Sequence, residues 1–112
     1  MDQRLIKALE ASKNLESLNR QKKYAFEKYQ ESITVYHNGG LFTAGVELIR
    51  EIGLYLSKDL ETAVFIDNEN IPIEIENLQN FYHKVWDIYI RALQEYKTEY
   101  NDIISILRNN SV

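Results

Sequence analysis

The sequence has no cysteine, one proline and four glycines among its 112 residues. Without cysteine the fold cannot contain a disulfide, a thiolate metal site or a cysteine nucleophile. The scarcity of glycine and proline leaves long stretches without the residues that most often interrupt a helix. A chain of this length suits one core, so residues 1–112 are expected to form a single domain.

Histidine and long apolar runs are also scarce. His37 and His83 are the two histidines, and local spacing places neither beside a second metal ligand or a catalytic carboxylate. The nucleophile and phosphate-loop motifs GxSxG, SxxK, GxGxxG and Walker A are absent from the sequence. No apolar run approaches the length of a membrane span, and residues 1–30 are too charged for a signal peptide. We therefore expect a protein that is not an enzyme, binds no cofactor or metal and does not associate with a membrane.

The net charge of −4 is unevenly distributed along the chain. Residues 1–37 contain seven Lys or Arg and five Asp or Glu, whereas residues 38–112 contain six and twelve. The basic N-terminal part could pair with the acidic remainder, within one chain or between chains. Only Arg20, Lys22 and Lys23 cluster, and nucleic-acid binding normally needs a larger basic patch, so no nucleic acid is expected as a partner.

The segment from Leu78 to Leu107 carries two adjacent stripes of mostly apolar residues at helical spacing. The first stripe contains Leu78, Tyr82, Val85, Tyr89, Ala92, Tyr96, Glu99, Ile103 and Ile106. The second contains Trp86, Ile90, Leu93, Lys97, Tyr100, Ile104 and Leu107. Together they make an apolar sector wider than contact with one helix requires. We predict a helix over residues 77–108 that is covered on more than one side.

Residues 2–31 are rich in Leu, Lys, Glu, Ala and Gln and contain neither glycine nor proline, which favours a second long helix. Its heptad positions hold Ala8, Ala11, Leu15, Leu18, Lys22, Ala25 and Tyr29. Because several of these residues are small or polar, this helix is expected to pack antiparallel on the C-terminal helix without covering both stripes. The uncovered remainder predicts a protein interface at Trp86, Ile90, Leu93, Tyr96, Tyr100, Ile104 and Leu107.

The middle of the chain, residues 33–75, contains the signals for two hairpins and a short helix. The runs Ile33–His37 and Leu41–Ala44 flank an Asn-Gly pair, which favours a hairpin because both residues accept positive φ. The alternative keeps residues 33–37 helical, with Gly39 or Gly40 ending the helix. Gly45 and Glu47 predict the start of a short helix over residues 45–57.

The runs 62–66 and 71–75 predict a second hairpin, with Pro72 on an edge strand. The intervening Asp67-Asn68-Glu69-Asn70 has turn composition and lacks the spacing of a calcium loop. The predicted fold class is therefore α+β and mainly α. Two long terminal helices pack antiparallel, with two short β-hairpins and one short helix between them.

Parts of the sequence resemble a group of small uncharacterised proteins of large tailed phages that infect marine bacteria and cyanobacteria. The resemblance rests on Tyr36–Phe42, Glu47–Ile49, Ile66–Asn68, Ile71–Ile73, Phe81, Tyr96 and Tyr100, and it covers roughly residues 30–103. It implies a phage-encoded accessory or virion-associated protein, located in the cytoplasm of the infected host cell or in the virion. It carries over no catalytic residue, because the group has no known mechanism.

The predicted order of elements is also similar, by architecture alone, to a prefoldin subunit, in which two helical arms are joined by β-hairpins. The short helix at residues 45–57 departs from that pattern. The expected function is that of a non-enzymatic assembly protein that forms a homo-oligomer through its helices. The alternative is a prefoldin-like chaperone or an inhibitor-type module that binds a different host or phage protein.

Overall fold

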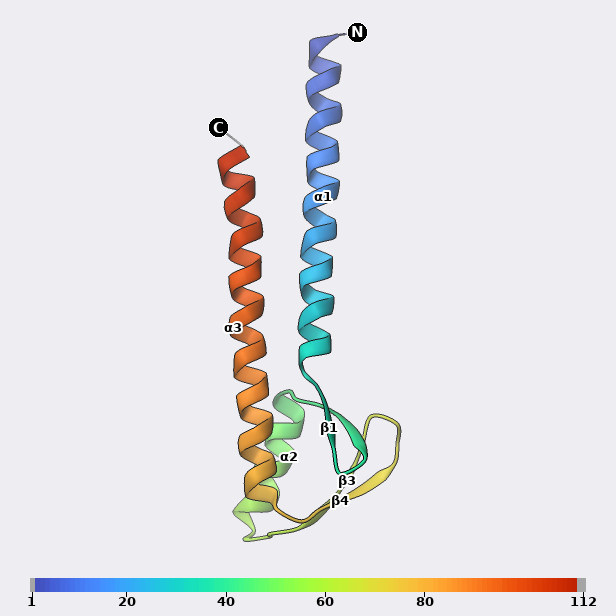
Figure 1. Ribbon diagram of the computed structural model, residues 1–112, viewed down its shortest axis with the longest axis vertical. Helices are drawn as coiled ribbons and strands as arrows, with labels where there is room; N and C mark the ends of the chain where they lie inside the picture. Colours follow the sequence, from blue (N-terminus) through green and yellow to red (C-terminus); the bar gives the residue numbers. More distant parts are fainter. Residues whose placement is uncertain (1, 111–112) are drawn as a thin grey trace.

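The computed structural model describes residues 2–110, and the side chains of residues 107–110 lie outside this description. The chain forms α1 (Gln3–Ser32), β1 (Thr34–His37), β2 (Gly40–Thr43), α2 (Val46–Ser57), β3 (Ala63–Ile66), β4 (Pro72–Ile75) and α3 (Leu78–Asn110). The molecule is a rod of 70 × 25 × 17 Å in which α1 and α3 run antiparallel and a small head (residues 33–77) closes one end (Figure 1). The predicted fold class is confirmed.

Local sequence explains where the helices begin. The Asp2 carboxylate accepts a hydrogen bond from the Arg4 N–H at the start of α1, and Asn77 Oδ1 accepts from the Asn80 N–H at the start of α3. Each of these bonds satisfies an N–H that has no partner inside the helix. Gly45 precedes α2, and Glu47 in its first turn is favourably placed against the helix dipole.

The first hairpin settles the alternative left open for residues 33–37. Thr34 to His37 form β1, and Ile33 ends α1. Asn38 and Gly39 have φ of 50° and 80°, as a two-residue hairpin turn with the right twist requires. Val35 then pairs with Phe42 across the two strands.

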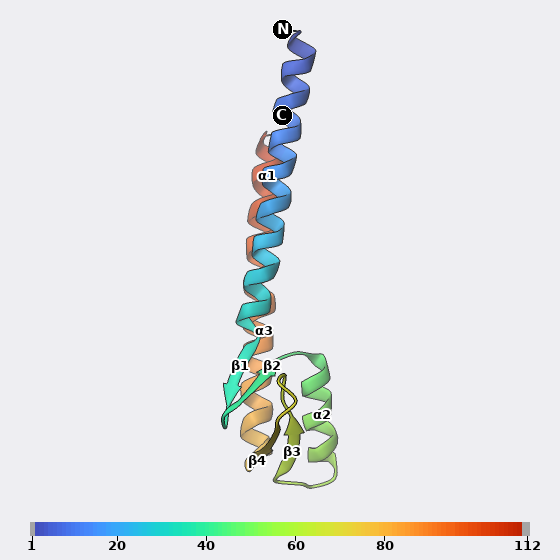
Figure 2. The same cartoon turned by 90° about the vertical axis from the view of Figure 1, so that its right-hand side faces the viewer.

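The two hairpins are separate two-stranded sheets that contact each other through their turns. The Asn68 N–H donates to the Leu41 carbonyl over 2.7 Å, and Asn38 Nδ2 donates to the Glu74 carbonyl over 3.3 Å. Gly40 is buried against this contact, since an added Cβ would lie 2.7 Å from Ile73 Cγ1. Figure 2 shows α2 and the β1–β2 hairpin at opposite sides of the head, with the β3–β4 hairpin between them.

The main core lies in the head, around the first turns of α3. The rings of Phe42, Phe65 and Phe81 meet edge to face, with centroids 5.4–6.5 Å apart. Ile52, Ile75, Leu78 and Val85 complete the fully buried set. The first stripe of α3 therefore begins inside a true hydrophobic core.

Above the head, only a narrow contact joins α1 to α3. A second, small core cluster contains Leu18, Ala25 and Ile103, with Tyr96 partly buried against it. The predicted seam positions Ala8, Ala11 and Leu15 are exposed. Because α1 extends past the last described residues of α3 (Figure 1), the register set by Lys28 and Glu99 places Ala8 and Ala11 beyond the described part of α3.

Candidate protein interface

The second stripe of α3 leaves a row of apolar side chains on the surface of the paired helices. We call Trp86, Ile90, Leu93, Lys97 and Tyr100 the α3 strip. Its four apolar side chains are 36–44% exposed. The first stripe faces α1 and the head, where Leu78, Val85, Ala92 and Ile103 are buried. Two stripes one residue apart on a helix cannot both face the same neighbour, so the second stripe is left open.

The open surface continues from α3 onto α1. Lys22 Nζ lies 5.6 Å from the centroid of the Tyr100 ring, within the range of a cation–π interaction. Phe26 is 44% exposed, and its ring centroid lies 5.9 Å from that of Tyr96. A shallow groove runs between them, lined by Leu93, Tyr96, Lys97, Tyr100 and Asn101. Aromatic and aliphatic side chains beside a few polar ones are typical of the centre of a protein–protein interface.

Three other residues of the predicted interface differ from the strip. Tyr96 belongs to the α1–α3 contact, because its ring stacks on Tyr29 with centroids 5.2 Å apart. Ile104 is half-buried. The side chain of Leu107 lies outside the described residues. The sequence assigned Tyr96 to both the seam and the interface. Its ring packs against Tyr29 and Phe26 and also lines the shallow groove, so Tyr96 stays a predicted interface residue.

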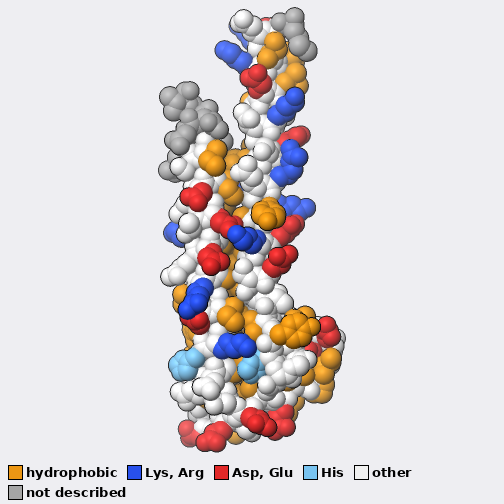
Figure 3. Space-filling model, viewed as in Figure 1, with side chains coloured by type: hydrophobic (Ala, Val, Ile, Leu, Met, Phe, Trp, Pro, Cys, Tyr) orange, Lys and Arg blue, Asp and Glu red, His pale blue; other side chains and the backbone are white. Residues whose placement is uncertain are grey.

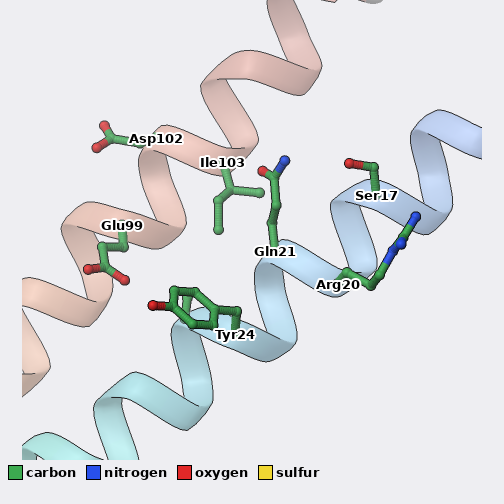
Figure 4. A pocket seen from close by; sticks show the side chains of 8 residues that line it. Ser17, Arg20, Gln21, Tyr24, Glu99, Asp102 and Ile103 are labelled. Carbon is green, nitrogen blue, oxygen red and sulfur yellow. The ribbon is translucent and has the colours of Figure 1, made fainter.

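The opposite side of the α1–α3 contact combines charged, polar and apolar side chains. A cleft of about 570 Å³ there is lined by Ser17, Arg20, Gln21, Tyr24, Ala25, Glu99, Asp102 and Ile103 (Figure 4). Next to it, Lys28 forms an ion pair with Glu99, which raises the pKa of Lys28 mainly through the hydrogen bond to that carboxylate. Figure 3 shows acidic and basic side chains distributed over both helices on one face of the rod. The cleft brings together no nucleophile with an adjacent base.

Asp67 is buried in the head, and the sequence did not predict its role. Its two carboxylate oxygens accept hydrogen bonds from the backbone N–H groups of Leu41, Glu69 and Ile71, over 2.8–3.0 Å. These bonds, led by the one from Leu41, hold the pKa of Asp67 below its ordinary value of 3.8. The carboxylate therefore fixes its own turn and ties it to β2. The signal in the sequence was an aspartate at the first position of a turn.

The two histidines make different contacts. The His37 ring packs on Phe81 with centroids 4.5 Å apart, and its Nδ1 lies 3.1 Å from Lys84 Nζ. Burial, assisted by the positive charge of Lys84, lowers the pKa of His37 below 6.5. The His83 ring packs edge to face on Tyr82. Among the residues that the structure describes, no three His, Asp or Glu side chains are grouped to hold a metal ion.

No protein-family model, no curated protein and no solved structure matches this chain. Within the described part of the chain, no helix combines the length and the apolar character needed to cross a lipid bilayer.

Proposed function

We propose that this protein is a non-enzymatic assembly protein that associates with copies of itself through the α3 strip and the adjoining side chains of α1. The observation that carries the proposal is the row of exposed apolar side chains on α3, interrupted only by Lys97 and lying beside the exposed ring of Phe26. Contiguous apolar surface of this kind, bordered by polar residues, is typical of interaction sites.

A comparison of free energies indicates a reversible association. Burying roughly 500 Å² of apolar surface on each of two copies at about 25 cal/mol per Å² would contribute on the order of 25 kcal/mol. The loss of translational and rotational freedom on association costs about 4–15 kcal/mol, and the ordering of interface side chains and the desolvation of polar groups cost more. A net gain of about 8 kcal/mol corresponds to a dissociation constant of about 1 μM, so we expect association that is controlled by concentration.

Sedimentation velocity across a concentration series tests the proposal. The wild-type chain should shift from monomer to a larger species as concentration rises. The Ile90→Glu variant should weaken this association at least a hundredfold, because the new carboxylate would be buried without a partner. Leu54→Glu is the matched control, since Leu54 is an exposed apolar residue on α2 and is not a member of the strip. A wild-type chain that stays monomeric at millimolar concentration contradicts the proposal, and circular dichroism shows whether each variant is folded.

A second candidate is a module that binds a different protein through the head. The observation that favours it is the outward face of β3, where Val64 and Ile66 are more than half exposed. If this face binds a partner, immobilised wild-type protein should retain one protein in stoichiometric amount and Ile66→Glu should not. Equal retention by both variants contradicts a site on the head.

An origin in a tailed phage, as an accessory or virion-associated protein, remains a proposal based on the sequence resemblance. The residues that carry the resemblance include Asn38, Gly39 and Asp67, which shape the two hairpin turns. They support a shared fold of the head and indicate no shared active site. Mass spectrometry of purified virions would test the proposal, and its absence from particles would leave only an accessory role in the infected cell.

A further inference from the structure

We infer that the α3 strip is covered by the N-terminal part of α1 from a second copy, so that two copies exchange their arms. We call residues 3–15 the N-terminal arm. The inference rests on the proposed self-association and specifies which segment of the partner occupies the strip. It combines three observations: an uncovered helical arm, an uncovered strip of matching length, and the distribution of charge along the rod.

The arm is a helix that packs on no other element among the residues whose side chains the structure describes. Every residue from Asp2 to Ser17 is exposed, including Leu5, Leu9 and Leu15. The pairing of Lys28 with Glu99 and of Tyr29 with Tyr96 fixes the register of the two long helices. By this register, Asn110 at the end of α3 lies at about the level of residues 15–17. Short helices are marginal in water without packing of an apolar face, so this arm is expected to find a partner.

The α3 strip and the N-terminal arm have similar lengths. From Trp86 to Tyr100 the helix rises about 21 Å, and the arm from residue 3 to residue 15 rises about 18 Å. At the end nearest the head, the α3 strip is bordered by α2, because Gly53 lies close to Tyr82 and the Tyr82 ring packs on Trp86. A helix laid on the strip therefore stops at α2 and extends away from the head.

Charge favours the orientation that arm exchange needs. The head (residues 33–77) contains eight Asp or Glu and two Lys or Arg, and Figure 3 shows acidic side chains gathered at its end of the rod. Side-by-side parallel rods would place two such heads together, within the screening length of about 8 Å at physiological salt. Antiparallel rods place the heads at opposite ends. Arm exchange is antiparallel, and it is symmetric because each copy supplies one arm and one strip.

The apolar area is sufficient for a dimer of ordinary size. Each copy contributes Leu5, Leu9 and Leu15 from the arm, Phe26 beside it, and Trp86, Ile90, Leu93 and Tyr100 from α3. At 36–57% exposure, these side chains present on the order of 500 Å² of apolar surface per copy. A standard interface buries about 800 Å² per partner, of which about 56–65% is apolar.

Cross-linking between introduced cysteines tests this arrangement directly, because the natural chain contains no cysteine. Ser12 is an exposed polar residue of the arm and Lys97 is the polar member of the strip, and the exchange places them within about one helical turn of each other across the dimer. Within one copy they lie about 25 Å apart along the rod, beyond the reach of a short cross-linker. The Ser12→Cys and Lys97→Cys variants are mixed and treated with a short bismaleimide, and the products are identified by intact mass.

Arm exchange predicts a covalent dimer of the two different variants in the mixture and little product from either variant alone. A cross-linked dimer of Lys97→Cys alone would show that two strips face each other, which overturns arm exchange while leaving self-association intact. A dimer by sedimentation that yields no cross-link between the two variants also overturns it. A chain that sediments as a monomer at every concentration removes the proposed function itself.

A variant in the arm gives an independent test. Leu9 belongs to neither core cluster of the described residues, so Leu9→Glu should leave thermal unfolding of the monomer unchanged. It should raise the dissociation constant of the dimer at least tenfold. Tyr24→Glu is the control, since Tyr24 is exposed on α1 and lines the cleft on the side of the α1–α3 contact opposite the strip. An unchanged dimer of Leu9→Glu contradicts a role for the arm.

Discussion

At the scale of single residues, the head is held together partly by polar side chains that form hydrogen bonds with backbone groups. Asp67 satisfies three backbone N–H groups with one carboxylate and joins two hairpins that share no strand pairing. Lys84 donates to the Tyr36 carbonyl and contacts His37 at the other side of the first hairpin. Such bonds matter because a buried donor or acceptor without a partner is costly.

Acid should weaken the fold through Asp67. Its pKa is lowered in the folded state, so its contribution to the free energy of unfolding is complete above the ordinary value of 3.8 and is lost as the pH falls through the folded pKa. We expect Asp67→Asn to be less stable than the wild type at pH 7, with the difference shrinking below about pH 4. Urea unfolding at several pH values measures this. A difference that stays constant down to pH 3 would contradict it.

At the scale of secondary structure elements, the two hairpins fit together because Gly40 has no side chain. In Gly40→Ala, the new Cβ would lie 2.7 Å from Ile73 Cγ1 and 2.8 Å from the Phe42 ring. Overpacking of this kind typically costs about 1–3 kcal/mol. We expect the free energy of unfolding to fall by about that amount, measured by urea unfolding. Gly45→Ala is the control, because no atom lies within 4 Å of its added Cβ and its φ is −138°.

The two long helices contact each other over only part of their length. Both are long because their sequences lack glycine and proline over most of their length. The contact between them is short and rests on small or flat side chains such as Ala25, Ala92 and Tyr96. The part of α1 outside this contact is the part that arm exchange would bury.

At the scale of the whole molecule, the two orientations of a dimer give different lengths. One copy is 70 Å long. Exchange of arms, with residue 3 of the partner placed near Ile90, would give a rod of about 90 Å from the rise per residue. A parallel pair would thicken while keeping the length of one copy. Small-angle X-ray scattering at a concentration where the dimer dominates distinguishes the two, and a maximum dimension near 70 Å would contradict arm exchange.

The sequence by itself determined the elements, because their signals are local. Asn38-Gly39 accepts the positive φ of a tight turn, and the side chain of Asn77 caps α3. The helix spacing of α3, the alternation in β4 and the order of the elements could be predicted for the same reason. Residues 33–37 stayed ambiguous, because strand preference and helix continuation compete at the end of α1.

The tertiary structure alone decided which surfaces are buried. A stripe of side chains on one helix is buried only as far as the adjacent helix extends. The head joins α1 to α3 and so fixes how far α1 extends past α3. This relation places Tyr96 in the seam, leaves Ala8 and Leu15 uncovered, and opens the α3 strip from Trp86 to Tyr100. The role of Asp67 was hidden for a related reason, since its partner Leu41 is distant in sequence. Local chemistry sets the conformation of a segment, whereas its exposure depends on contacts made across the fold.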